Sequence, residues 1–240
     1  MTPEELKAAV ESVWWWHSIE IPGYGLTPGH EPNSRSRDAY MNIPWAELKG
    51  KTVLDIGAWD GLYSFLAEEA GAENVVAADI YWSAEWLPKS DGIRLAIAAK
   101  NSKVKATRFD VEEGALKSVI ARALRDGVSV QADVCFFFGV LYHLQNPLRA
   151  LHNVAASIKP GGLLILETAT TARFIDKDEE SSVPFLELCE GERDGDATNW
   201  SYPNRAWVEA ALRIVGFEQI EYQGGISNRA AWHARKKTLA

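Results

Sequence analysis

Residues 53–65, VLDIGAWDGLYSF, pass from a short buried strand through a bend into a helix. Gly57 and Gly61 break the strand, and an apolar, helix-like run follows them. In α/β proteins a glycine bend between a strand and a helix lines the crevice at the carboxyl ends of the strands, where nucleotides bind. The stretch therefore predicts a nucleotide-type site, in a bend that also carries Trp59.

The side chains of the bend exclude two common ligand classes. A dinucleotide site requires glycine at positions 57, 59 and 62, because the pyrophosphate approaches the bare backbone there, yet Trp59 and Leu62 occupy two of them. A P-loop requires Gly-Lys-Ser or Gly-Lys-Thr after the bend, and this sequence lacks it. The remaining candidate is a ligand that contains an adenosine but has no phosphates between its two halves. Such a ligand can lie beside the bend.

Strand-like and helix-like segments alternate from residue 51 onward. The segments predicted as parallel strands are 52–56, 74–79, 103–110, 132–138 and 162–168. One helix is expected to begin at Asn146, to include Ile158 and to stop at Pro160, and another follows Pro203. Residues 218–223 and 228–236 predict a closing hairpin. This order predicts an α/β fold with a doubly wound, mostly parallel seven-stranded sheet.

The chain is expected to form a single domain over residues 1–240. Its predicted parts are an N-terminal helical cap over 1–50, a cofactor-binding core over 51–169, a lid insertion over 170–204, and a C-terminal helix and hairpin over 205–240.

Composition narrows the class of protein. The net charge of −8 and the pI near 5.2 make nucleic acid an unexpected partner. Cys135 and Cys189 predict neither a disulfide framework nor a metal site. The acidic N-terminus and the lack of an apolar run of about 20 residues predict a cytoplasmic protein with no membrane contact. The Trp-rich N-terminus is interpreted as a lid or as a homodimer contact.

Carboxylates follow consecutive predicted strands. Asp79 ends the second strand, where a carboxylate accepts hydrogen bonds from both hydroxyls of a ribose. Asp110 ends the third, within reach of an adenine amino group, and Val111 is expected to pack on the ring. Asp55 precedes the bend and is expected to orient the loop or to meet an ammonium group.

The series VLDIGAWDG, VVAAD and FDVEE resembles class I S-adenosylmethionine-dependent methyltransferases, whose fold is Rossmann-like. The resemblance covers roughly residues 50–236 and implies S-adenosyl-L-methionine as cofactor. It implies that Asp55, Gly57 and Gly61 shape the methionine end of the site, with Trp59 lining it where glycine is commoner. It also implies that Asp79 holds the ribose and Asp110 the adenine.

A narrower set of motifs, among them WWHSIEI, FFGVLYHLQNPLRAL and TNWSYPNRAWVEAALRIVGF, resembles the tRNA wobble-uridine carboxymethyltransferase subgroup. That resemblance implies a cofactor carboxylate held by a lysine, a tyrosine and an arginine. Tyr142 and Arg229 match two of these, but residues 8–48 contain no lysine. We therefore expect the ordinary cofactor and transfer of a methyl group.

Three residues are candidates for the base that takes a proton from an oxygen acceptor. His143 follows the fourth strand, His17 reaches the crevice from the cap, and Glu167 ends the fifth strand. The residues expected to bind the acceptor come mainly from the cap and the lid: Trp16, Tyr24, Asn199, Trp200, Tyr202, Asn204 and Arg229.

The sequence thus predicts a methyltransferase that acts on a small-molecule acceptor, at oxygen, by in-line displacement, in natural product biosynthesis or sugar-related metabolism. Two alternatives stay open. One is modification of a wobble uridine in tRNA, which would need a basic stripe made of Arg35, Arg37, Arg205 and Arg229. The other is a non-catalytic cofactor-binding protein.

Overall fold

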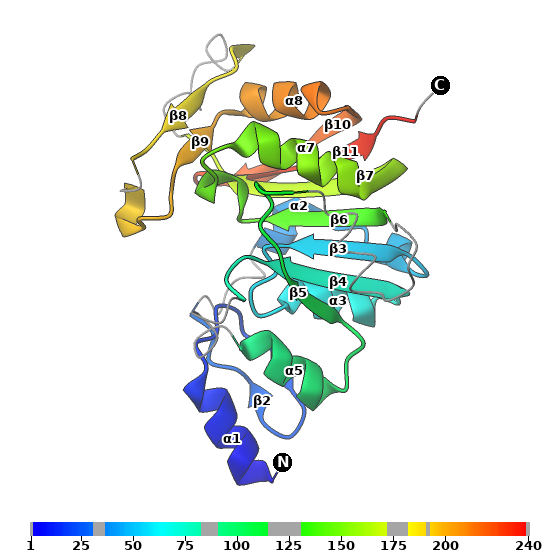
Figure 1. Ribbon diagram of the computed structural model, residues 1–240, viewed down its shortest axis with the longest axis vertical. Helices are drawn as coiled ribbons and strands as arrows, with labels where there is room; N and C mark the ends of the chain where they lie inside the picture. Colours follow the sequence, from blue (N-terminus) through cyan, green and yellow to red (C-terminus); the bar gives the residue numbers. More distant parts are fainter. Residues whose placement is uncertain are drawn as a thin grey trace.

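The computed structural model describes residues 2–30, 37–82, 91–114, 131–171, 182–190 and 193–238. Its centre is a seven-stranded sheet with the strand order β10-β11-β7-β6-β3-β4-β5 (Figure 1). The five parallel strands are β3 (Thr52–Ile56), β4 (Asn74–Asp79), β5 (Lys105–Arg108), β6 (Ala132–Phe138) and β7 (Ile158–Ala169). The predicted doubly wound α/β fold is confirmed.

The order of the strands reverses beside β3. From β3 the chain adds β4 and then β5 on one side, and it returns to place β6 and then β7 on the other. In such sheets the ligand crevice lies beyond the carboxyl ends of the strands at this reversal. The bend at residues 57–61 follows β3 directly, so the topology places it in that crevice.

An antiparallel hairpin completes the sheet. Strand β11 (Arg229–Lys236) pairs with β7, and β10 (Phe217–Ile226) pairs with β11, as the sequence predicts. Because β11 runs opposite to β7, its first residue lies at the carboxyl edge of the parallel strands, with Arg229 opposite Ala169. The hairpin therefore brings a cation to the edge where the crevice opens.

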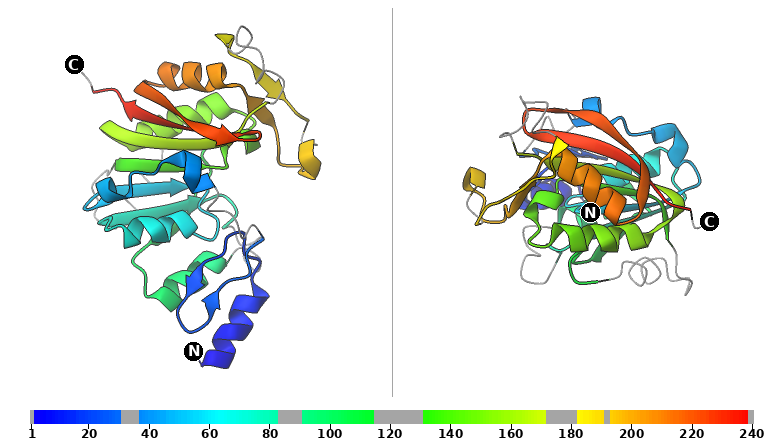
Figure 2. Two further views of the ribbon diagram at one scale, coloured as in Figure 1. Left: turned by 180° about the vertical axis from the view of Figure 1, so that it is seen from behind. Right: turned by 90° about the horizontal axis from the view of Figure 1, so that it is seen from above.

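Helices cover both faces of the sheet (Figure 2). The apolar residues of α7 (Pro147–Ser157) and α8 (Arg205–Ile214) join one buried cluster, together with Leu54 and Phe137 of the strands. Those of α3 (Leu62–Glu69) and α5 (Gly92–Lys100) join a second cluster, with Val53 and Phe136. Consecutive strand residues alternate between the two clusters, as expected for a sheet buried on both faces.

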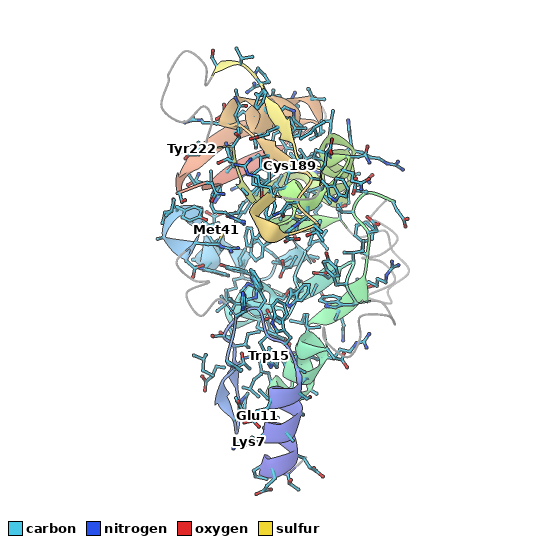
Figure 3. The ribbon with its side chains drawn as sticks, turned by 90° about the vertical axis from the view of Figure 1, so that its left-hand side faces the viewer. Lys7, Glu11, Trp15, Met41, Cys189 and Tyr222 are labelled. Atoms are coloured by element: carbon cyan, nitrogen blue, oxygen red, sulfur yellow. The ribbon has the colours of Figure 1, made fainter. Side chains whose placement is uncertain are left out.

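The N-terminal segment packs onto the second of these clusters. It comprises α1 (Pro3–Ser12), β1 (Glu20–Ile21), β2 (Gly25–Leu26), α2 (Asp38–Met41) and the 3₁₀ helix η2 (Trp45–Leu48). Trp15 and Ile21 are buried in that cluster, and Trp15 lies where α1 meets the rest of the molecule (Figure 3). The segment thus shares its apolar core with the sheet.

Several element boundaries differ from the prediction. Helix α7 ends at Ser157, and β7 begins at once, because Ile158 adopts an extended conformation and pairs with Ala132 of β6. Strand β5 is shorter than expected and spans Lys105–Arg108. Asp110 and Val111 therefore lie in the turn after the strand.

The described part of the insertion between β7 and α8, residues 182–190 and 193–204, forms a ribbon that stands away from the sheet (Figures 1 and 2). Strand β8 (Leu186–Leu188) pairs antiparallel with β9 (Ser201–Pro203), and the short 3₁₀ helix η6 (Arg193–Gly195) lies between them. The acidic run predicted as part of the lid, 176–182, lies almost wholly outside the described residues.

Within the described ranges, every helix is too short or too polar to cross a membrane. The predicted cytoplasmic location and the homodimer contact stay predictions.

Asn204 is expected to stabilise the ribbon and α8 instead of binding the acceptor. Its Oδ1 accepts from the amides of Trp207 (2.9 Å) and Phe185 (3.0 Å), and its Nδ2 donates to the Val183 carbonyl (2.7 Å). Asn204→Ala should lower the free energy of unfolding by about 1 to 3 kcal/mol in urea denaturation. Asn204→Ser, which keeps a helix cap, should recover part of the loss. Wild-type stability in Asn204→Ala would contradict this assignment.

Candidate active site

The backbone of the bend after β3 follows from its two glycines and from Trp59. Gly57 and Gly61 have φ angles of 76° and 87°, in the left-handed region that glycine tolerates best. A Cβ on Gly57 would lie 2.2 Å from Cγ2 of Val140, so a larger residue does not fit. Trp59 also has a positive φ, 47°, which costs free energy in a bulky residue. Neighbouring groups must therefore hold it in place.

Asp79, at the end of β4, holds the bend. Its two carboxylate oxygens accept from the amides of Trp59 and Tyr81, each at 2.9 Å, while the Trp82 indole donates to the Trp59 carbonyl at 3.1 Å. Burial raises the pKa of Asp79 to about 6, although the two amide bonds act against this rise. An ionised carboxylate has about four acceptor positions. The backbone amides of Trp59, Tyr81 and Ile80 leave an acceptor position for a ribose hydroxyl, so this carboxylate fits the predicted cofactor.

Asp55, the fourth residue of β3, is buried beside the bend. The Ser64 hydroxyl donates to its Oδ2 at 2.6 Å, and burial raises its pKa to about 7. Asp110 accepts from the Glu112 amide at 2.8 Å, which shapes the turn after β5. Val111 is buried in the core, and its carbonyl accepts from Asn153 at 2.7 Å. The adenine contacts of Asp110 and Val111 stay predictions.

Asp60 is a residue of the bend that the sequence analysis missed. Its Oδ2 accepts from the amides of Trp16 (2.8 Å) and His17 (2.7 Å), and its Oδ1 contacts Nδ1 of His17. The side chain is almost fully buried. Asp60 thus ties the N-terminal segment to the bend and gives His17 an anchoring role, while the role of His17 as a base stays a prediction.

Aromatic rings gather beside the bend. The Trp59 ring lies 5.4 Å from that of Trp14 and 5.2 Å from that of Tyr81, and Trp16 and His30 both pack against Trp14. Trp14 is 43% exposed, so the cluster forms part of the surface. Trp16 therefore lies near the predicted cofactor site.

Tyr24 lies elsewhere, in the turn between β1 and β2, a hairpin that contacts α5. Its ring packs against the second buried cluster. Tyr24 therefore has a packing role, and its predicted acceptor contact stays a prediction.

A buried ion pair lies at the carboxyl edge of β7 and the start of β11. Arg229 donates to both oxygens of Glu167, at 2.7 and 2.6 Å, and the Tyr40 hydroxyl donates to Oε1 at 3.0 Å. Glu167 is fully buried, and the guanidinium of Arg229 lies 4.9 Å from the centre of the Tyr142 ring. These three donors occupy acceptor positions on both oxygens of Glu167. We therefore do not retain Glu167 as a base.

His143 lies at the same edge, in the 3₁₀ helix η3 (Leu141–His143) that follows β6. Its Nδ1 lies 3.1 Å from the Thr198 carbonyl, and its ring is half-buried against Tyr142. Since a carbonyl only accepts, Nδ1 carries the proton and Nε2 has the free electron pair. Burial lowers the pKa of His143, so the imidazole is neutral near pH 7. These are the properties of a general base.

The other predicted acceptor ligands of the lid divide between two roles. Tyr202 is 1% exposed and lies beneath the Arg193 guanidinium, 4.0 Å from its ring centre, so it packs the ribbon and cannot reach an acceptor. Asn199 is buried and donates to the Arg193 carbonyl at 2.9 Å. The Trp200 amide donates to the Tyr142 carbonyl at 2.9 Å. This bond holds the half-buried Trp200 residue beside η3, at the carboxyl edge of the sheet.

With this geometry established, comparison with known proteins defines the class. A family model described as a methyltransferase domain matches residues 33–219, and the chain belongs to this family. The match confirms the predicted S-adenosylmethionine-dependent methyltransferase class and its cofactor.

Particular relatives and structures add detail. A protein from Pseudomonas aeruginosa named tRNA U34 carboxymethyltransferase is 30% identical over 222 residues, which cover 89% of this chain and 59% of the relative. The chain thus spans less than two thirds of the length of that relative. The N-terminal domain of EvdMO1 with SAH bound has a TM-score of 0.65 and 19% identity, covering 99% of this chain and 98% of that one.

A second solved structure, the S-adenosylmethionine-dependent methyltransferase from Mesorhizobium loti, has a TM-score of 0.61 and 18% identity. The alignment covers 87% of this chain and 100% of that one. At these identities the two structures show the shared fold.

Replacing Asp60 should release the N-terminal segment. In Asp60→Asn a neutral amide replaces the carboxylate, so the amides of Trp16 and His17 lose their charge-assisted hydrogen bonds and a donor replaces the acceptor at Nδ1 of His17. The free energy of unfolding should fall by about 2 to 3 kcal/mol, and chymotrypsin should cleave near Trp14 faster. Glu11→Gln, an exposed change of the same charge on α1, is the control. Cleavage at the wild-type rate in Asp60→Asn would refute the anchoring role.

Binding of S-adenosylhomocysteine should depend on the ionisation of Asp79. Because its pKa is about 6, affinity should rise between pH 5 and pH 7 as the carboxylate forms, by up to about tenfold per pH unit below the pKa. Asp55, with a pKa of about 7, titrates in the same window, so calorimetry is repeated with Asp79→Asn. That variant should bind about 10- to 100-fold more weakly at pH 7 and show a flatter profile. Parallel profiles would place the ribose elsewhere.

Proposed function

We propose that this methyltransferase transfers a methyl group to an oxygen of a small-molecule acceptor, with His143 as the general base. The observation that carries the proposal is the orientation of the His143 ring. The Thr198 carbonyl engages Nδ1, which leaves the electron pair of Nε2 for the acceptor at the carboxyl edge of the sheet. Lowering of the His143 pKa by burial keeps that electron pair available near neutral pH.

The residues around the crevice have distinct tasks in this reaction. In this proposal the carboxylate of Asp79 accepts from the ribose, and the resemblance assigns Asp55 to the methionine end. When bound, S-adenosylmethionine would supply an activated methyl group and would retain the electron pair of the broken carbon–sulfur bond as a neutral thioether. The acceptor oxygen forms the new bond to carbon, and its proton passes to Nε2 of His143. Alignment of the reactants supplies much of the rate enhancement.

The Glu167–Arg229 pair supports the ordinary cofactor over a carboxylated one. The resemblance to the carboxymethyltransferase subgroup assigns Arg229 to the carboxylate of the cofactor. In this structure Arg229 already donates to both oxygens of Glu167. A further carboxylate beside this pair would meet the negative charge of Glu167. Electrostatic repulsion in a buried setting opposes such a ligand.

Modification of a wobble uridine in tRNA is the second candidate, and the name of the Pseudomonas aeruginosa relative favours it. The contact between Arg229 and Tyr142 agrees with the narrower resemblance. The basic stripe is less well supported, because Arg229 is paired with Glu167 and Arg205 with Glu209 (2.7 Å). Arg35 lies outside the described residues.

A labelling experiment separates these functions. The protein is incubated with methyl-labelled S-adenosylmethionine and, in parallel, with a small-molecule extract or with total tRNA. We expect label in the small-molecule pool, and a loss of about 100-fold or more in His143→Gln with unchanged affinity for S-adenosylhomocysteine. His152→Gln, on the exposed side of α7, is the matched control.

Three results would count against the proposal. Label in tRNA alone would favour the wobble-uridine enzyme. Label in neither pool would favour the non-catalytic alternative. Transfer by His143→Gln at the wild-type rate would remove His143 from the reaction.

A further inference from the structure

His143 does not determine its own orientation, because the lid insertion supplies its hydrogen-bond partners. We propose that Asp196 and Thr198 are positioning residues that hold His143 in the form with its electron pair on Nε2. This inference rests on the proposed function, since it assigns these residues a role in preparing the base. Both belong to the segment between η6 and β9, about 55 residues from His143 in the chain.

The contacts form a short chain of hydrogen bonds. The Thr198 hydroxyl lies 2.6 Å from Oδ1 of Asp196 and 2.9 Å from Nδ1 of His143. The Thr198 amide donates to the same Asp196 oxygen at 2.8 Å, and the Thr198 carbonyl lies 3.1 Å from the same His143 nitrogen. Thr198 therefore contacts both residues through its side chain and its backbone.

The direction of each bond follows from what each atom can donate. An ionised carboxylate only accepts, so the proton of the Thr198 hydroxyl points to Asp196. The hydroxyl oxygen can then act only as an acceptor toward His143, as the carbonyl does. Both partners of Nδ1 are acceptors, which requires the proton on Nδ1. Without Asp196 the hydroxyl could rotate and donate to Nδ1, which would move the proton of the imidazole to Nε2.

The charges near His143 agree with this arrangement. Burial lowers the pKa of His143, the Thr198 carbonyl and Asp196 raise it, and Arg229 lowers it. Tyr142 packs against the ring, with the ring centres 4.0 Å apart, and Tyr81 hydrogen-bonds to Thr198. The carboxylate of Asp196 therefore also stabilises the positive charge that His143 gains when it accepts a proton.

The insertion and the base are thereby connected. Trp200 donates to the Tyr142 carbonyl at 2.9 Å, so the segment is fastened to η3 on both sides of Asn199. The proton position of His143 therefore depends on contacts from the described part of the insertion.

Nuclear magnetic resonance of the ring nitrogens tests the proposal without turnover. The protein is labelled with ¹⁵N-histidine, and the His143 signals are followed through a pH titration in the wild type, Asp196→Asn and Thr198→Val. Because Asp196 is exposed, Asp196→Asn should fold normally. Glu11→Gln, far from the ribbon on α1, makes the same change of charge as a control (Figure 3).

We expect wild-type His143 to carry its proton on Nδ1. In Asp196→Asn the pKa of His143 should fall by about 0.5, the effect of removing a solvent-screened charge roughly 5 Å away, and a population with the proton on Nε2 should appear. Thr198→Val keeps the carbonyl, so the proton should stay on Nδ1 while the pKa falls. Glu11→Gln should match the wild type.

A proton on Nε2 in the wild type would overturn the proposal, and so would an unchanged His143 titration and proton position in folded Asp196→Asn. These outcomes are distinct from failure of the proposed function. If no methyl transfer occurs, the labelling experiment fails while the proton position of His143 can still be observed. If transfer occurs by another base, His143→Gln keeps its rate whatever the resonance data show.

Discussion

The site depends on one buried carboxylate. Asp79 accepts two backbone hydrogen bonds and thereby keeps Trp59 in a left-handed conformation that its side chain disfavours. The same carboxylate has an acceptor position left for a ribose, so one group shapes the bend and addresses the ligand. Burial makes the ionised form of Asp79 less favourable, because desolvation raises the pKa of the carboxyl group.

Two segments outside the regular α/β alternation complete the site. Asp60 fastens the N-terminal segment to the bend and brings Trp14 and Trp16 beside Trp59. At the carboxyl end of β6, Thr198 fastens the ribbon to His143. The sheet therefore supplies the floor, while its two additions supply the aromatic wall and the orientation of the base.

The sheet and its strand-end carboxylates could be predicted because they follow from local patterns. Buried parallel strands are apolar throughout, and carboxylates at consecutive strand ends beside a glycine bend together indicate the crevice. Asp55 and Asp79 were found in this way. The exact end of α7 could not be found, because the pairing of Ile158 with Ala132 decides it.

The partners of the lid and cap residues were beyond sequence reasoning. Asn204 and Tyr202 are residue types that often bind an acceptor. In this structure Asn204 binds the Phe185 amide, and the Tyr202 ring packs against Arg193. In the sequence, Asp60 and Asp196 resemble ordinary turn residues. Asp60 is important because it binds His17, which lies 43 residues away in the chain. Asp196 is important because it contacts His143 through Thr198, which is 55 residues from that histidine. The pairing of Glu167 with Arg229 likewise joins two strands that are distant in sequence.

A crystal structure of the full chain with S-adenosylhomocysteine tests the account most directly. It should show a ribose hydroxyl within hydrogen-bond distance of the Asp79 carboxylate, with the Trp59 backbone still bound to the same group. A nucleoside held away from Asp79, or a Trp59 ring occupying the place of the ribose, would contradict the assignment of this crevice.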